Sequence, residues 1–353
     1  MNIHNFLHRM AMPALSVLIA ATFVSPAQAQ PSIAYRYNFV KIDYPKAPAS
    51  FPLSINSKRQ IIGVWIDANG VYHGYLYQGG KFTNIEYPGA LQIQGGGTFT
   101  AGLNDRGDIS GTFKDKDGYQ HGFIRTLPED CDDDRDGKCK PIYRQIDVPG
   151  AAKTKDVPFE LGTGLGTGVA GINNYQDVVG LYATHEAAPY SLGFKLSHGR
   201  FTTIDDPASG HTVGTGSRTF SLNDYGDVVG AYSKQTSASP YPINGGFVFD
   251  GKEYISVYVK DSEKGYFGTQ ANGINNRQEV VGVFSDPLGI FHGLYWVRHQ
   301  SFTLDYPNEP FTECHSINAK GDITGAYLSR PDLYDPKFGF AYRGFVAFLK
   351  DND

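Results

Sequence analysis

The chain has 353 residues, of which 41% are hydrophobic and only 19% are charged, and its formal net charge is −5. It contains 42 Gly, 20 Pro, 23 Tyr and 23 Phe, a composition that argues against intrinsic disorder and against a coiled coil or helical bundle. The negative charge makes nucleic acid and anionic lipid poor candidate partners. We therefore expect a β-rich globular protein that binds neither of them.

The first 29 residues have the pattern of a signal peptide. An apolar run from Ala14 to Val24 is followed by the small-x-small triplet Ala27-Gln28-Ala29. A retained membrane anchor is the alternative, but the longer run from Met10 to Val24 spans about fifteen residues and is broken by Pro13, whereas a spanning helix needs roughly 20. We expect cleavage before Gln30 and a secreted or periplasmic protein without membrane insertion after cleavage.

A short motif recurs six times along the rest of the chain. Each copy consists of a small residue, Ile or Leu, and Asn, with Gly seven positions after the Asn. The six pairs are Asn56 and Gly63, Asn104 and Gly111, Asn173 and Gly180, Asn223 and Gly230, Asn275 and Gly282, and Asn318 and Gly325. The spacing between successive copies varies while the inner spacing does not, so a rigid unit is repeated with variable connections.

Repetition also indicates what these residues do. A catalytic group needs one copy, whereas a group that builds the fold needs one copy in every repeat. We therefore predict that the six Asn are structural and form hydrogen bonds in the first hairpin turn of each unit. The six Gly are expected where backbones approach closely.

Each repeat can be interpreted as four strands. In the fourth repeat, residues 219–222 and 227–232 flank the turn Asn223–Gly226, and a second hairpin joins 246–249 to 254–257 across Asp250-Gly251. Six such units at a period of roughly 50 residues match an all-β, six-bladed β-propeller with four-stranded antiparallel blades. We expect residues 30–353 to form this one domain.

The two ends of the chain complement each other. The last repeat ends at 344–348 and lacks a fourth strand, while residues 37–43 form a strand without a partner in their own repeat. We predict that the N-terminal strand is the outer strand of the sixth blade, which closes the ring and removes two exposed sheet edges. A solenoid is the alternative, but it would need a cap at each end and would leave this strand unexplained.

Several repeated segments resemble those of a known group of proteins. Strands begin with His73-Gly74, His121-Gly122 and His292-Gly293, and the chain repeats Phe-Thr-x-Ile-Asp-x-Pro and Gly-Ile-Asn-Asn-x-x-x-Val-Val-Gly. In these motifs the chain resembles the bacterial extracellular HAF-repeat proteins over essentially its whole length after the signal. The resemblance implies a repeat-built propeller outside the cell and says little about activity. Three blades depart from His-Gly, with Leu192-Gly193, Gly245-Gly246 and Arg343-Gly344.

Repeated polar residues near the outer strands have a structural interpretation. Acidic residues precede x-Pro in five repeats, at Asp43, Glu86, Asp147, Asp205 and Asp305. We expect them to cap the turn before each proline rather than to form a carboxylate ring. The three repeated His are expected to satisfy a local backbone hydrogen bond rather than to bind a metal.

An acidic insertion interrupts the second blade at residues 124–141. Its residues Asp132, Asp134, Asp136, Gly137 and Lys138 follow the start of an EF-hand calcium loop, in which alternating carboxylates and a carbonyl bind a hard cation. The acidic residue that such loops carry at position twelve is replaced by Tyr143. A bound Ca²⁺ is therefore one prediction, and a solvated acidic loop without metal is the alternative.

The three cysteines divide into a pair and a single residue. Cys131 and Cys139 flank the acidic loop, and an exported protein meets oxidising conditions, so we expect them to form a disulfide. Cys314 is then expected to be a buried free thiol.

No sequence motif specifies a reaction. The chain lacks Gly-x-Ser-x-Gly, His-Glu-x-x-His and paired Cys-x-x-Cys. The long connections before the inner strands should share one face of the propeller, the face that usually binds ligands. Polar groups expected near the axis on this face are Arg218, Gln270, Glu313 and His315, and the aromatic candidates are Tyr87, Phe99, Tyr266 and Phe311.

We expect an extracellular binding or scaffolding module for a carbohydrate or peptide, whose apolar faces stack on aromatic rings while polar groups bind its hydroxyls or amides. The alternative is a secreted enzyme acting on polysaccharide, with Glu313, His315 and Arg218 as acid–base candidates at the axis. Unrepeated ionisable side chains at the axis would favour the enzyme, and an apolar or plugged channel would favour the module.

Overall fold

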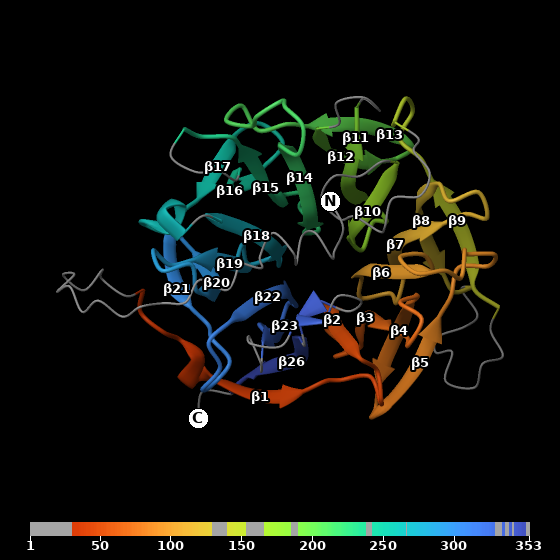
Figure 1. Cartoon of the computed structure of the whole chain (residues 1–353), viewed down its shortest axis with the longest axis horizontal. Coiled ribbons are helices and arrows are strands. Elements are labelled where there is room, and N and C mark those ends of the chain that lie inside the picture. Colours follow the sequence, from red (N-terminus) through yellow and green to blue (C-terminus); the bar gives the residue numbers. More distant parts are fainter. Residues whose placement is uncertain are drawn as a thin grey trace.

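The computed structural model describes residues 30–128, 140–152, 166–184, 190–237, 242–265, 267–328, 334–335, 339–340 and 342–350. These residues form an all-β propeller of four-stranded antiparallel sheets arranged around a central axis (Figure 1). Two 3-10 turns, η1 (Ala34–Arg36) and η3 (Ser262–Gly265), accompany the strands. No helix in the described residues is long and apolar enough to cross a membrane.

Four sheets consist of four strands each. The first contains β2 (Ala49–Ile55), β3 (Ile61–Ile66), β4 (Tyr72–Gln78) and β5 (Lys81–Ile85), and the second contains β6 (Thr98–Leu103), β7 (Ile109–Lys114), β8 (Gln120–Thr126) and β9 (Ile142–Ile146). Another contains β18 (Thr269–Ile274), β19 (Val280–Ser285), β20 (Phe291–Val297) and β21 (Gln300–Thr303). The last contains β22 (Thr312–Ile317), β23 (Ile323–Leu328), β26 (Tyr342–Leu349) and β1 (Tyr37–Lys41). The two-residue strands β24 (Tyr334–Asp335) and β25 (Gly339–Phe340) pair with each other.

The prediction of six separate four-stranded sheets is wrong, because eight strands form one sheet. These strands are β10 (Thr167–Ile172), β11 (Val178–Ala183), β12 (Ser191–Ser197), β13 (Arg200–Ile204), β14 (Gly216–Leu222), β15 (Val228–Lys234), β16 (Ile243–Phe249) and β17 (Tyr254–Val257). A single parallel pair, Ser191 with Gly216, joins an antiparallel run β10–β13 to a second run β14–β17. Gly216 has φ +123°, and a Cβ there would lie 2.1 Å from the Ser191 carbonyl oxygen. Because glycine has no side chain, the backbones of the two runs can approach closely at Gly216.

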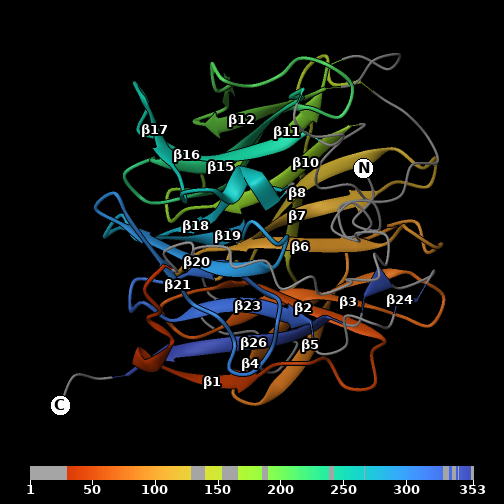
Figure 2. The same cartoon turned by 60° about the vertical axis from the view of Figure 1, so that its left-hand side comes forward.

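The N-terminal strand closes the ring as predicted. β1 pairs antiparallel with β26, with Tyr37 opposite Leu349 and Lys41 opposite Phe345. Figures 1 and 2 both show β1 lying along β26 at the outer edge of this sheet. Segments from the two ends of the described chain therefore share one sheet, and both edges that they would otherwise expose are paired.

All six inner strands contain a β-bulge at the same place. The hydrogen-bond register shifts by one residue three positions before each repeated Asn. The extra residues are Leu53, Ala101, Ala170, Phe220, Asn272 and His315. A bulge re-aims the side chain of its extra residue. In this protein the bulges decide which side chains face the axis.

The repeated Gly lie opposite the inner strands, as predicted for close backbone approaches. A Cβ at Gly63 would lie 2.1 Å from the Phe51 carbonyl oxygen, and a Cβ at Gly325 would lie 2.2 Å from that of Glu313. The core lies between neighbouring sheets, where each third strand buries one large side chain completely. These side chains are Tyr75, Phe123, Phe194, Phe247, Leu294 and Phe345.

The six repeated Asn form hydrogen bonds within their turns, which confirms the prediction, and they also link the turns to one another. Each Oδ1 accepts from the backbone N–H groups two and four residues later, as Asn104 does from Arg106 and Asp108. Each Nδ2 donates to the carbonyl oxygen of the next repeated Asn, over 2.9–3.4 Å. The sixth bond runs from Asn318 back to Asn56. We call this closed cycle the Asn ring.

Candidate functional site

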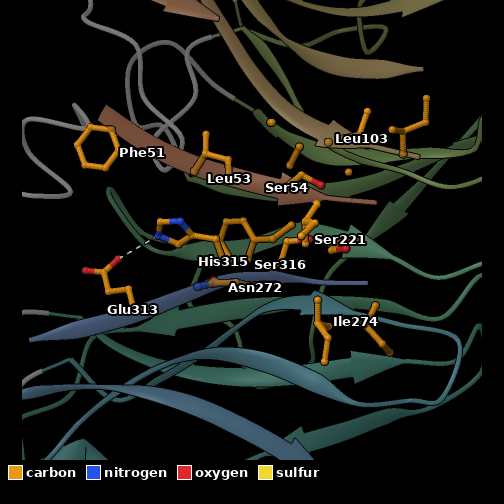
Figure 3. Close-up of a pocket in the computed structure, with 18 of the residues that line it drawn as sticks. Phe51, Leu53, Ser54, Leu103, Ser221, Asn272, Ile274, Glu313, His315 and Ser316 are labelled. Carbon is orange, nitrogen blue, oxygen red and sulfur yellow. Dashed lines mark ion pairs between the residues drawn. The ribbon is translucent and has the colours of Figure 1, made fainter. Parts of the chain in front are cut away.

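The propeller axis contains a cavity of about 220 Å³. All six inner strands (β2, β6, β10, β14, β18 and β22) contribute to its wall, together with Ala326 of β23 and Tyr342 of β26. The extra residue of every bulge is among the lining residues. We call it the axial cavity (Figure 3).

A ring of aliphatic side chains closes one end of the axial cavity. These are the residues directly before each repeated Asn, namely Ile55, Leu103, Ile172, Leu222, Ile274 and Ile317. The same six residues also line a second, smaller cavity of about 80 Å³, whose other walls are the Asn ring and the residues that follow it. The aliphatic ring therefore separates the axial cavity from the opening at the Asn ring.

The wall of the axial cavity is chemically divided. β2 and β6 supply the apolar residues Phe51, Leu53, Phe99 and Ala101. On the other side, β18 and β22 supply the polar residues Gln270, Asn272, Glu313 and His315. These side chains occupy equivalent positions, three and five residues before the repeated Asn. The fold supplies the same two positions in each repeat, and the sequence makes them apolar or polar.

Glu313 and His315 point toward each other across the polar side (Figure 3). Their Oε2 and Nε2 atoms are 3.8 Å apart. The other ring nitrogen of His315, Nδ1, lies 2.8 Å from the carbonyl oxygen of Pro52. Tyr342 donates its hydroxyl to Glu313 Oε1 over 3.4 Å. Burial, followed by the neighbouring Glu313 carboxylate, raises the pKa of Tyr342 well above its usual value, so this hydroxyl stays a donor.

Two amide side chains extend the polar side. Gln270, which is 5% exposed, donates Nε2 to Asn272 Oδ1 over 2.7 Å. Asn272 in turn donates Nδ2 to the carbonyl oxygen of Cys314 over 2.9 Å. The side-chain oxygen of Gln270, Oε1, is buried and has no hydrogen-bond partner in the described part of the chain. A buried acceptor of this kind is costly unless a bound molecule satisfies it.

The structure brings four of the sequence-predicted site residues together and separates three. Phe99, Gln270, Glu313 and His315 line the axial cavity, whereas Arg218, Tyr87 and Phe311 are not among its lining residues. Arg218 donates to Asn244 Oδ1 over 2.7 Å and is held there. Tyr87 stacks on Phe113 with ring centroids 3.5 Å apart. Phe311 packs against Phe291.

Sequence reasoning missed Phe51, Leu53, Asn272 and Tyr342 as lining residues. These four residues lie within strands, and none of them is a one-off ionisable group beside a long connection. Alignment of the six repeats on their Asn would have supplied a signal, because the positions three and five residues earlier vary while their neighbours are small or aliphatic. That signal could not show which positions face the axis, since the bulges are not visible in the sequence.

The repeated His bind carboxylates, so the expectation of backbone hydrogen bonds is wrong. His73 Nδ1 lies 2.7 Å from Glu86, His121 Nδ1 lies 2.7 Å from Asp147, and His292 Nδ1 lies 2.9 Å from Asp305. In each case a second carboxylate from the preceding turn faces the other ring nitrogen. The acidic residues before x-Pro therefore tie the outer strand to the third strand through these His.

Burial alone would lower the pKa of His292, but hydrogen bonds and charge from Asp286 and Asp305 raise it to about 9. The pKa values of His73 and His121 are also raised, again against the effect of burial, by their paired carboxylates. His292 is therefore a structural cation at neutral pH.

The predicted calcium and disulfide residues lie outside the described residues. These are Cys131, Asp132, Asp134, Asp136, Lys138 and Cys139, and Tyr266 lies outside them too. Within the described ranges, no group of three or more His, Cys, Asp or Glu side chains could hold a metal ion. Cys314 is a buried free thiol, as predicted, and burial raises its pKa well above the usual value.

The sequence matches no protein-family model and no curated protein. In structure the chain is similar to the fucose-specific lectin of Aleuria aurantia, with 10% identity, 77% of this chain and 80% of the lectin covered, and a TM-score of 0.40. It is also similar to Trypanosoma rangeli sialidase in complex with sialic acid, with 9% identity and a TM-score of 0.46. This match covers 93% of this chain and 60% of the sialidase chain. A third similar structure is AofleA of Arthrobotrys oligospora, with 10% identity, 91% of each chain covered and a TM-score of 0.47. At this distance the likenesses carry no argument about a ligand or a reaction.

Proposed function

We propose that the protein is an exported binding module that takes a small carbohydrate, on the order of one sugar ring, in the axial cavity. The observation that carries this proposal is the division of one cavity into an apolar side with Phe51 and Phe99 and a polar side with Gln270, Glu313 and His315. The signal-like residues 1–29 support export.

A sugar ring has the matching division of chemistry. Its C–H face is apolar and packs on aromatic rings, while its hydroxyl groups at the ring edge hydrogen-bond polar side chains. The buried Gln270 Oε1 supplies an acceptor that no described residue satisfies. A hydroxyl group from a bound sugar would satisfy it and offset its cost of burial.

The size of the cavity limits the ligand. Sites for drug-sized molecules usually measure about 300–1,000 Å³. The axial cavity, at about 220 Å³, is smaller. A single ring, or the terminal ring of a longer glycan, is therefore the appropriate size, and an extended peptide or polysaccharide segment is not.

Isothermal titration calorimetry of the full mature chain with a panel of monosaccharides tests this proposal. At least one sugar should bind, and Phe99→Ala should weaken it by about tenfold, which corresponds to roughly 1.4 kcal/mol. Leu288→Ala is the control, because Leu288 is 82% exposed on the turn after β19. If no sugar binds, or if both variants have the same effect, the proposed function is wrong.

A secreted enzyme is the second candidate, and the Glu313–His315 pair favours it. These unrepeated ionisable groups face each other at the axis, as the enzyme interpretation requires. However, Glu313 is the single carboxylate among the described residues that line the axial cavity. Most glycoside hydrolases use two carboxyl groups about 5–9.5 Å apart. We therefore place binding first, and release of nitrophenol from a panel of nitrophenyl glycosides would reverse that order.

We also propose that the eight-stranded sheet acts as two blades, which would make the propeller six-bladed. The single Ser191–Gly216 pair between its two runs supports this, as does the sixfold Asn ring, to which each run contributes one Asn. Amide hydrogen exchange tests the proposal. The two runs should open with separate protection factors, and a single protection factor across all eight strands would contradict it.

A further inference from the structure

The direction of each hydrogen bond on the polar side of the axial cavity is fixed by a backbone carbonyl. A carbonyl oxygen can only accept, so the Cys314 carbonyl requires the NH₂ group of Asn272. Asn272 therefore turns its oxygen toward Gln270, and Gln270 must turn its own NH₂ group toward Asn272. Among the residues that the structure describes, the oxygen of Gln270 is left without a partner. This chain of bonds makes Gln270 an acceptor toward a ligand.

The same reasoning applies to His315. The Pro52 carbonyl oxygen lies 2.8 Å from Nδ1, so Nδ1 carries a proton. In the neutral ring, Nε2 then has a lone pair and acts as an acceptor. The distance of 3.8 Å between His315 Nε2 and Glu313 Oε2 is longer than a hydrogen bond. Both atoms therefore stay available to accept a hydrogen bond from a ligand.

Glu313 is the third acceptor. It is 6% exposed, and its partners are the Tyr342 hydroxyl at 3.4 Å and His315 at 3.8 Å. No Lys or Arg is among the described residues that line the axial cavity. Arg218, whose backbone lies on β14, donates to Asn244. A buried carboxylate without a close cation is costly, and a cationic ligand would lower that cost.

The geometry points to a protonated amine as the group that the axial cavity selects, and therefore to an amino sugar as its ligand. This inference rests on the proposed function. An ammonium group has three N–H donors and no acceptor, which matches the three acceptors Gln270 Oε1, the Glu313 carboxylate and His315 Nε2. The rings of Phe51 and Phe99 on the apolar side attract a cation as well.

The acceptor wall also predicts what the cavity rejects. A uronic acid would place a second carboxylate beside Glu313, and like charges in a buried site repel strongly. Acetylation of the amine removes the charge and two of its three donors. Acidic sugars should therefore not bind, and N-acetylated sugars should bind no better than neutral ones.

Calorimetry with glucosamine, glucose, N-acetylglucosamine and glucuronate tests the inference, at a pH where the amine is protonated. Glucosamine should bind about tenfold more tightly than glucose, since hydrogen bonds to charged groups are the stronger ones. Glu313→Gln should abolish this preference, so that glucosamine and glucose bind the variant with equal affinity. Glu253→Gln, an equal charge change on the exposed turn between β16 and β17, should leave the preference intact.

Further arms separate the inference from the proposed function. Gln270→Leu removes an acceptor without changing charge and should weaken glucosamine binding, with folding of each variant checked by its melting temperature. Equal binding of glucose and glucosamine, or a preference that survives Glu313→Gln, overturns the inference while the sugar-binding function stands. Cyclohexylamine carries the ammonium group without hydroxyls. If it binds in a Glu313-dependent way and no sugar does, the amine inference holds and the sugar-binding function fails. If no probe binds, both fail.

Discussion

A single asparagine side chain is the smallest unit that specifies this fold. Its oxygen holds the turn of its own repeat, and its NH₂ group holds the turn of the next, as Asn104 does toward Arg106, Asp108 and Asn173. The sequence predicted the first role, because an Asn before a tight turn is typical of hairpins. It could not predict the second, since a bond between repeats depends on the distance between turns 48 or 69 residues apart along the chain.

Replacement of one repeated Asn tests this double role. Asn104→Ala should reduce the free energy of unfolding by about 2–4 kcal/mol, because it removes the acceptor of two backbone N–H groups and one of the two donors to the Asn173 carbonyl. Asn69→Ala removes an exposed turn Asn and should cost much less. Chemical denaturation measures both. Equal costs would show that the Asn ring contributes nothing beyond local turn chemistry.

The histidine of the β20 sheet predicts a dependence of stability on pH. The pKa of His292 is raised to about 9 from a usual 6.5, so its stabilising contribution is complete below about pH 6.5 and is lost as the pH rises through 9. The difference in melting temperature between the wild type and His292→Gln should therefore be largest near pH 6 and shrink toward pH 10. A constant difference across this range would contradict the charged pair with Asp286 and Asp305.

At the scale of elements, the sequence predicted hairpins well and bulges not at all. The turn residues and the alternation of apolar residues indicate four strands in each repeat. A bulge shifts the register by one residue and so changes the face on which every following side chain lies. The local composition gives no signal for its position. His315, Leu53 and Asn272 all occupy bulge positions. His315 could be proposed as a site residue because it is an unrepeated ionisable group, whereas Leu53 and Asn272 carry no such signal. The segment with the calcium motif stays a prediction.

Removal of the N-terminal strand tests the closure of the last sheet. Deletion of residues 30–43 should lower the melting temperature and promote aggregation, because it exposes the edge of β26 and uncovers Phe345 beneath Phe39. A synthetic peptide of residues 37–43 added in trans should restore part of the stability by strand addition. A deleted chain that melts like the full mature chain would remove the structural role assigned to β1.

The junction inside the eight-stranded sheet can be tested at Gly216. Gly216→Ala should destabilise the protein by about 2 kcal/mol more than Gly251→Ala. Both residues have positive φ, but a Cβ at Gly251 would meet nothing within 4 Å, whereas a Cβ at Gly216 would meet the Ser191 carbonyl. Equal destabilisation in urea unfolding would indicate that only the backbone conformation matters at Gly216.

On the scale of the whole molecule, one ion pair marks the junction between the first and last repeats. At two other junctions, Gln176 and Gln278 donate to acidic residues of neighbouring turns. At the closing junction, the equivalent residue is Arg59, which forms two hydrogen bonds with the buried Asp322, at 2.9 and 3.2 Å. A charged bidentate pair holds this junction, where no peptide chain joins the inner turns directly.

The closing pair should therefore matter more than its uncharged equivalents. Arg59→Ala should cost about 1–2 kcal/mol after allowance for solvent screening, since Arg59 is half-exposed. Gln176→Ala, at the matching position with nearly the same φ, should cost about half as much. Arg59→Lys should fall between them, because it keeps the charge and loses the bidentate geometry. Denaturation that ranks Gln176→Ala as the more harmful change would refute this account.

The Asn ring has a consequence for the order in which the molecule is assembled. Its six bonds all run in the same direction and return to their origin, so the cycle has no first or last member. During synthesis, Asn56 is the first of the six Asn to be made and Asn318 is the last. The Asn56 carbonyl therefore cannot accept its hydrogen bond in the ring until Asn318 has been made. A chain that ends before Asn318 can form hairpins but cannot complete the circle. Completion of the circle thus requires synthesis at least as far as the sixth repeated Asn, and a circular permutant opened at any outer connection should still be able to complete it.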